Sequence, residues 1–175
     1  FGAADLKAKD QAANGYRKGV PMGGDLKAHG GRKAPTFLVA AMKDPQGANL
    51  DRVQVVKGWL DADSNTQERI YDVAVSDGRS IGADGRCATA VGNTVDLNTG
   101  QYRNDIGAAE LHAVWRDPHF DPAQRAFYYA RVLEIPTPRY SLLDSIALGK
   151  PWEDTGRPAT IQERVYGSPI WYTPQ

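Results

Sequence analysis

Alternating apolar and polar residues mark two neighbouring segments in the first half of the chain. In "LDRVQVVKGWLD" (residues 50–61), valines alternate with arginine and glutamine, which is the period of two of a β-strand with one buried face. The turn-forming residues of "DADSN" follow at 61–65. Residues 66–77 ("TQERIYDVAVSD") then predict the returning strand of a β-hairpin.

Shorter apolar runs predict further strands along the chain. The run "PTFLVAAMKDP" (35–45) lies between prolines, and eight of the twelve residues of "QRAFYYARVLEI" (124–135) are apolar or aromatic. The final segment "IQERVYGSPIWYTP" (161–174) predicts a strand that is interrupted near Gly-Ser-Pro. We also expect two short strands in "TVDLNTGQYRN" (94–104), whereas "GAAELHAVWRDP" (107–118) fits either a strand or a helical turn.

The remaining segments predict connections. Residues 1–18 carry good helix formers with a thin apolar stripe, which indicates one short helix or a linker. Residues 78–93 are rich in glycine and small residues and predict a loop. The proline-rich residues 136–160 predict a long excursion before the last strand, with one helical turn. We therefore divide the chain into a linker with a glycine-rich loop (1–34) and a β-domain (35–175).

Six to eight short strands separated by turns predict a mainly β fold, and specifically an immunoglobulin-like β-sandwich. In "AFYYARV", Tyr128, Ala130 and Val132 share one face. This matches the penultimate strand of such a sandwich, where a tyrosine near the strand start caps the corner. Trp59 is a candidate for the large aromatic residue of the core.

Composition excludes several classes of partner. The 175 residues contain 21 Lys and Arg against 21 Asp and Glu, so net charge gives no reason to expect nucleic acid or an anionic membrane as partner. No apolar run approaches the roughly 20 residues of a membrane-spanning helix. The single cysteine, Cys87, cannot form an internal disulfide. The chain begins at Phe1 without a signal-peptide pattern, and we expect it to be a piece of a longer protein.

The glycine-rich stretch "GVPMGGDLKAHGGRK" (19–33) raises the question of phosphate binding. Gly19 and Gly24 have the spacing of a phosphate-binding loop, but Asp25 stands where that loop needs lysine, and no helix pattern follows. A carboxylate there would repel a phosphate. We therefore interpret the stretch as a hinge, or as the rim of a site that lies elsewhere. The candidate residues are Gly19, Pro21, Met22, Gly23, Gly24 and Asp25.

Metal-ligand patterns are weak. His29, His112 and His119 have no H-x-H or H-E-x-x-H spacing, so we expect no metal site in this chain. The segment 61–68 ("DADSNTQE") resembles a calcium loop superficially but has threonine where an EF-hand needs glycine, and a hairpin turn explains it better. Asp77 and Asp84, each in an Asp-Gly-Arg triplet, also fit turns better than a cation site.

Three residues of "WRDPHFDP" are weak acid–base candidates: Asp117, His119 and Asp121. They could act together if they were folded over a cleft, although two Asp-Pro steps around a histidine more often make a rigid turn. Asp25 with His29 is a second possible pair. Cys87 has no histidine nearby in the sequence, and no G-x-S-x-G elbow exists.

Several segments resemble the C-terminal part of a bacterial family of unknown function. They include "GYRKGVPMGGDL", "YDVAVSDGR" and "VWRDPHFDPAQRAFYYARVLEIPTPR". Members of that family resemble metal-dependent phosphoesterases of the PHP (polymerase and histidinol phosphatase) superfamily. Their C-terminal β-sandwich carries a pattern similar to "YYARV" (128–132) and "SPIW" (168–171) here.

The resemblance implies a non-catalytic accessory domain of a hydrolase, partnered by an N-terminal metal-binding barrel of the same protein, with an exported, periplasmic or secreted location. The H-x-H motif of such barrels does not occur in these 175 residues, so no catalytic or metal residue is carried over. A divalent metal is expected only in the barrel. The alternative is a free-standing module that binds a glycan or a protein through exposed aromatic residues; the candidates are Trp115, Trp152, Trp171 and Tyr172.

Overall fold

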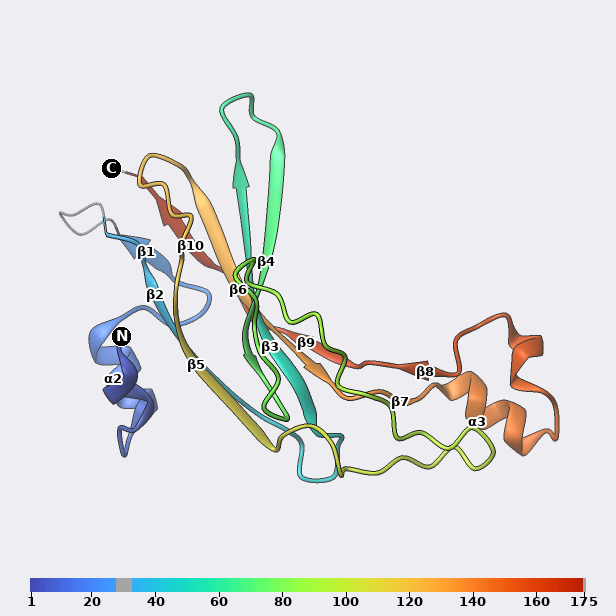
Figure 1. Cartoon of the computed structure of the whole chain (residues 1–175). Helices are drawn as coiled ribbons and strands as arrows, with labels where there is room; N and C mark the ends of the chain where they lie inside the picture. The colour runs from blue at the N-terminus through green and yellow to red at the C-terminus, as the bar shows by residue number, and fades with distance from the viewer. Residues whose placement is uncertain (28–32, 175) are drawn as a thin grey trace.

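A computed structural model describes residues 1–27 and 33–174. Strands dominate it, with helices only near the N-terminus and in one excursion (Figure 1). The predicted mainly β fold is confirmed. The elements are α1 (Ala3–Leu6), α2 (Gln11–Lys18), β1 (Asp25–Lys27), β2 (Thr36–Met42), β3 (Leu50–Leu60), β4 (Thr66–Val75), β5 (Glu110–Arg116), β6 (Ala126–Glu134), β7 (Thr137–Pro138), α3 (Tyr140–Ala147), the 3₁₀-helix η1 (Trp152–Thr155), β8 (Thr160–Ile161), β9 (Arg164–Tyr166) and β10 (Ile170–Thr173).

The larger sheet has the strand order β1-β10-β6-β3-β4, and β9 pairs with β6 beyond the end of β10. The long hairpin β3–β4 and the antiparallel pair β3–β6 form its centre. The interruption predicted at Gly-Ser-Pro separates β9 from β10, and both segments pair with β6. The glycine-rich stretch contributes β1, which runs parallel to β10. The larger sheet therefore includes residues that precede position 35.

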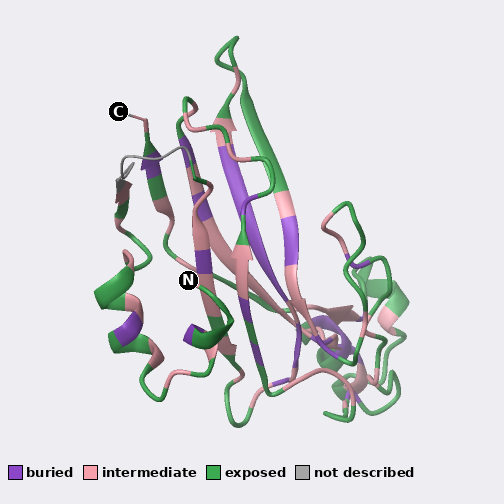
Figure 2. Cartoon of the chain, turned by 60° about the vertical axis from the view of Figure 1, so that its left-hand side comes forward, coloured by how far each residue is buried: buried purple, intermediate pink, exposed green. Residues whose placement is uncertain are grey.

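The smaller sheet consists of β2 and β5, paired antiparallel without a break from Thr36↔Arg116 to Met42↔Glu110. It packs on one face of the larger sheet, which makes the β-sandwich. The alternation along β2 explains this packing, because Phe37, Val39 and Ala41 face the larger sheet and belong to its hydrophobic clusters. In Figure 2, buried residues run along most of β3 and part of the neighbouring strands, whereas the tip of the β3–β4 hairpin is exposed.

The face of β6 that Tyr128, Ala130 and Val132 were predicted to share points into the sandwich. Tyr128 is 1% exposed and packs with Phe37 and Val55 at the centre of the core. Trp59 also packs against this cluster, as expected, but it is only partly buried. The Tyr128 hydroxyl donates a hydrogen bond to the Asp117 carboxylate at 2.7 Å. A side chain eleven residues upstream thus takes the place of the backbone group that a tyrosine corner normally uses.

Two predictions of local structure were wrong. Residues 94–104 contain no strand; the chain turns there, because Asp96 accepts hydrogen bonds from the amides of Asn98 and Thr99, and Gly100 adopts a positive φ of 68°. The excursion 136–160 holds the two-turn helix α3 and a 3₁₀-helix instead of one helical turn. Leu142 of α3 is 1% exposed, so apolar packing stabilises a helix that its proline-rich flanks do not predict.

Candidate binding site at the edge of the sandwich

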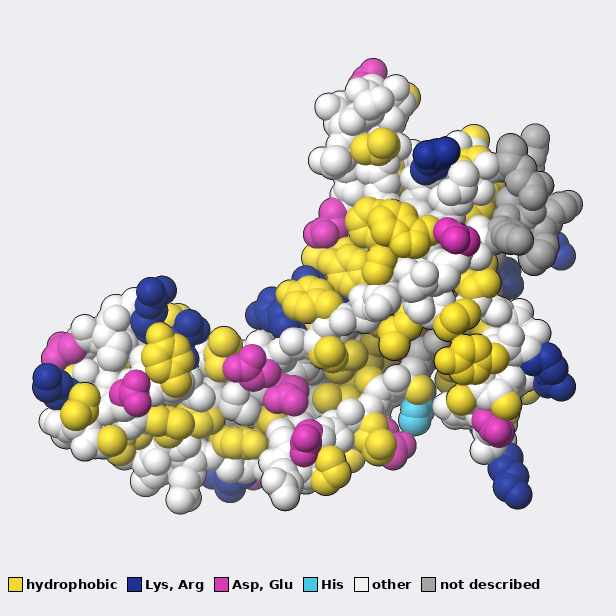
Figure 3. All heavy atoms as spheres, turned by 180° about the vertical axis from the view of Figure 1, so that it is seen from behind, with side chains coloured by type: hydrophobic (Ala, Val, Ile, Leu, Met, Phe, Trp, Pro, Cys, Tyr) yellow, Lys and Arg dark blue, Asp and Glu magenta, His cyan; other side chains and the backbone are white. Residues whose placement is uncertain are grey.

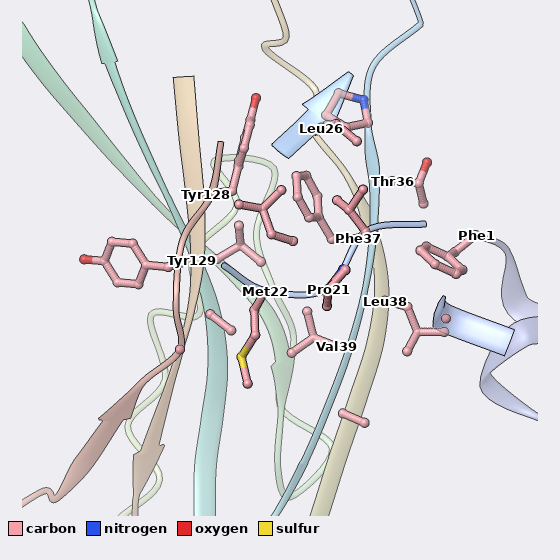
Figure 4. A pocket seen from close by; sticks show the side chains of 18 of the residues that line it. Phe1, Pro21, Met22, Leu26, Thr36, Phe37, Leu38, Val39, Tyr128 and Tyr129 are labelled. Carbon is pink, nitrogen blue, oxygen red and sulfur yellow. The ribbon is translucent and has the colours of Figure 1, made fainter. Parts of the chain in front are cut away.

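An apolar pocket of about 540 Å³ lies at the edge of the sandwich, between the free side of β2 and the β6–β10 part of the larger sheet (Figure 4). Residues 36–40 of β2 form one wall, and Tyr128 and Ile170 belong to the opposite wall. Helix α2 and the segment 20–22 also contribute to the lining. The pocket exists because the six-stranded larger sheet is wider than the two-stranded sheet that packs on it.

The predicted rim loop contributes directly to this pocket. Pro21 and Met22 line it, and the Met22 side chain is 68% exposed at its mouth. The next residues attach to the larger sheet: the Gly23 amide donates to the Pro169 carbonyl at 3.0 Å, and the Gly24 carbonyl accepts from the Trp171 amide at 3.0 Å.

The remaining loop candidates, Asp25 and Gly19, lie on either side of the residues that attach the loop to the larger sheet. Asp25 begins β1 and pairs with Trp171. Gly19 is the other end of the loop, where the Phe1 ring packs so closely that a Cβ would lie 2.8 Å from it. His29, the possible partner of Asp25, lies outside the described residues.

The edge of β2 beside the pocket carries backbone groups directed away from β5. The Asp117 amide donates to the Pro35 carbonyl, and the Lys43 amide donates to the Ala109 carbonyl. Because the register is unbroken and antiparallel pairs alternate, residues 35, 37, 39, 41 and 43 bond toward β5. The amides and carbonyls of residues 36, 38, 40 and 42 therefore point to the pocket side.

The three acid–base candidates do not converge on one cleft. Asp117 is 2% exposed, accepts the His119 backbone amide at 2.8 Å, and forms an ion pair with Lys57 at 2.7 Å. The His119 ring is instead on the surface, with Nδ1 3.0 Å from the Tyr71 hydroxyl. Asp121 is exposed and accepts the amide of Ala123.

Burial keeps the Tyr128 hydroxyl of this cluster protonated. Desolvation, followed by the hydrogen bond to the Asp117 carboxylate, raises the pKa of Tyr128 far above its usual value of 10. Tyr128 therefore remains a neutral donor, and Asp117 accepts from it and from Lys57. The cluster stabilises the core, because its hydrogen bonds join side chains inside the sandwich.

A second buried charge network, not identified from the sequence, lies on β3 and β4. Asp51 accepts Arg79 at 2.6 Å and Arg52 at 3.0 Å, while Asp72 accepts Arg52 at 3.0 Å and the Cys87 amide at 2.7 Å. These contacts fasten the loop after β4 to the sheet. The available signal was the presence of Asp51, Arg52 and Asp72 within segments predicted as strands.

The turn residues considered as cation ligands make hydrogen bonds within their own loops. Asp61 accepts the amides of Asp63 and Asn65 in the β3–β4 turn, and Asp84 accepts the Arg86 amide. Asp77 accepts the Gly107 amide. Among residues 1–27 and 33–174, no three His, Cys, Asp or Glu side chains are grouped closely enough to hold a metal ion.

The aromatic candidates divide between the core and the surface. Trp115 packs against Phe37 and Tyr71, with ring centroids 5.9 and 4.8 Å away. Tyr172 is also a core residue, 5% exposed, with its hydroxyl donating to Pro122. Trp152 lies in η1, in the excursion. Only Trp171 belongs to a larger aromatic surface.

That surface is the outer face of the larger sheet, where Trp171, Phe127, Tyr129 and Tyr166 form a continuous row. The register places them on one face, because Trp171 pairs with Phe127 and Tyr166 pairs with Arg131. Neighbouring centroids are 5.3 to 6.3 Å apart. Figure 3 shows the corresponding hydrophobic stretch below the β3–β4 hairpin.

Comparison with protein families confirms that the chain belongs to a family of unknown function. A family model described as "Protein of unknown function (DUF3604)" matches residues 1–174. The chain belongs to the DUF3604 family. The match includes the rim loop, both sheets and the excursion, so the pocket is built entirely from residues of the family region. No curated protein and no solved structure matches the chain.

The helices of the DUF3604 region are short. Within the described residues, none is long and apolar enough to cross a membrane.

Proposed function

We propose that this DUF3604 chain is a non-catalytic accessory region of a metal-dependent phosphoesterase-like hydrolase of the PHP type, exported from the cell. Its catalytic barrel and divalent metal would lie outside these 175 residues. The observation that carries the proposal is the position of Asp117. This residue is the best acid–base candidate, but its carboxylate is buried and accepts hydrogen bonds from Lys57 and Tyr128. The pocket at the sandwich edge is then the natural surface for contact with the barrel.

Activity assays with a charge introduced at the pocket test this proposal. We expect the chain alone to leave p-nitrophenyl phosphate and bis(p-nitrophenyl) phosphate intact with Mn²⁺, Mg²⁺ or Zn²⁺. The longer gene product should hydrolyse one of them, and Met22→Glu should weaken that activity by disturbing the interface. Leu148→Glu is the matched control, because Leu148 is 69% exposed and Met22 is 68% exposed, but Leu148 lies after α3.

Metal-dependent turnover by the chain alone would refute the accessory role. A longer gene product without metal-dependent phosphoesterase activity would refute the hydrolase assignment.

The aromatic row supports a second candidate function, the binding of a glycan. Trp171 and Tyr166 are about half exposed, and aromatic rings offer apolar faces on which sugar rings can stack. Glu68 and Arg131 lie on the same face of the sheet and supply an acceptor and donors for sugar hydroxyls.

Tryptophan fluorescence during titration with cellohexaose, xylohexaose and chitohexaose tests this candidate. We expect a response that Trp171→Ala removes and Trp152→Ala leaves in place. No response to any of the three sugars would count against glycan binding.

A further inference from the structure

The geometry points to β2 as an acceptor for one more strand: we propose that an extended segment of a partner polypeptide, uncharged and with apolar side chains at alternate positions, adds to the free edge of β2. The added strand would extend the smaller sheet and place its apolar side chains in the pocket. The inference does not rest on the hydrolase role and needs only the chain itself.

The first argument is the hydrogen bonding of β2. Its groups at residues 36, 38, 40 and 42 point away from β5, and among the described residues β2 pairs only with β5. A row of unpaired amides and carbonyls is the template on which a further strand forms. At about 3.4 Å per residue, the seven residues of β2 offer an edge about 24 Å long.

The second argument is that the sequence of β2 itself lacks the residues that normally protect a free edge, although α2 and segment 20–22 lie across the pocket from it. Such edges carry charged residues, prolines or bulges. Between Pro35 and Lys43, the sequence "TFLVAAM" has no charge and no proline, and its pairing has no bulge. The outer face of the partner strand β5 differs, because it exposes Glu110, His112 and Arg116.

The third argument is the chemistry of the adjoining pocket. Leu26, Tyr128 and Ile170 of the larger sheet line its inner side, next to the β2 edge. Alternate side chains of a strand point to opposite faces, so every second residue of an added strand would enter this apolar space. A charged or continuously polar segment would bury unpaired groups there. The backbone edge and the pocket together thus specify the occupant.

Peptide binding to the 175-residue chain tests the proposal. The probe is an acetylated and amidated nonapeptide of alternating threonine and valine, measured by isothermal titration calorimetry. Its control is the same peptide N-methylated at every residue, which keeps the side chains but has no backbone donors. We expect the first peptide to bind and the second to fail.

Leu38→Pro is the decisive variant, because it removes an amide donor that points to the pocket and leaves the bonds of Phe37 and Val39 to β5 intact. We expect it to weaken peptide binding by about tenfold or more, relative to the matched Leu38→Ala variant. Ala40→Pro should have the same effect and serves if Leu38→Pro fails to fold by circular dichroism.

Three results would overturn the proposal. The first is no binding of the unmethylated peptide. The second is equal affinity of Leu38→Pro and Leu38→Ala, since the pocket would then take apolar segments without strand pairing. The third is a dimer in sedimentation that Leu38→Pro dissociates, because β2 would then pair with a second copy of this chain.

Discussion

Lys57 and Asp117 form an ion pair inside the sandwich, with side chains only 3% and 0% exposed. A buried pair is retained only when further hydrogen bonds satisfy both groups. Lys57 also donates to the His119 carbonyl, and Asp117 also accepts from Tyr128. The sequence suggested Asp117 as a catalytic residue, but period-two patterns cannot reveal which distant strand supplies its partner.

Removing Asp117 should therefore destabilise the whole domain. We expect Asp117→Ala to lower the free energy of unfolding by about 3–5 kcal/mol, because Lys57 would remain buried without a counter-charge. Urea denaturation measures the change. Lys57→Met combined with Asp117→Leu should recover most of it, and the exposed Asp121→Ala should cost little. A loss below 1 kcal/mol for Asp117→Ala would contradict this role.

Asp5 fixes the N-terminal helices through charge. Hydrogen bonds from Lys18, the Gly2 amide and Asn14 lower the pKa of Asp5 well below its ordinary value. A lowered pKa means stability that is present above pH 4 and is lost as the pH falls further.

The Asn14 side-chain amide, which donates to Asp5 at 2.6 Å, should report this titration in NMR spectra. We expect its midpoint to lie below 3.8, the value of an unperturbed aspartate. A midpoint at 3.8 or higher would show that α1 is not held in this way.

At the scale of elements, the strands with clear alternation were predictable and the smallest ones were not. Strands β3, β4 and β6 lie where their hydrophobic patterns predict strands, but β3 is buried on both faces instead of the one face that its alternation indicated. Strand β1 was missed, because three residues inside a glycine-rich stretch have no period and become a strand only by pairing with β10. The pocket was equally inaccessible, since it depends on how many strands each sheet contains.

Gly58 packs closely against the Phe127 ring, a contact that the hydrophobic pattern of the sequence does not predict. The Phe127 ring lies across it, and a Cβ at this position would be 2.2 Å from the nearest ring atom. We expect Gly58→Ala to lower stability by about 1–3 kcal/mol in urea denaturation, because the ring must move. Gly15→Ala in α2 is the control: its Cβ would meet open space, so stability should stay level or rise. Equal effects of the two substitutions would refute the close packing.

At the scale of the whole molecule, the two sheets have unequal width. The larger sheet has six strands, five of them side by side across its width, whereas the sheet that packs on it has two. This difference in width leaves both the apolar pocket and the open side of β2. The segment 20–25 crosses from the helices to the larger sheet at the same edge. The unequal width of the two sheets is therefore the structural basis for proposing a binding role for the open edge of β2.

Amide hydrogen exchange along β2, measured by NMR on the free chain, is the most direct test of whether the outer edge of β2 is open. We expect Phe37, Val39 and Ala41 to exchange slowly, because their amides bond to β5, and Leu38, Ala40 and Met42 to exchange much faster. Equal protection of the two sets would contradict the account, because the outer edge of β2 would then already be paired.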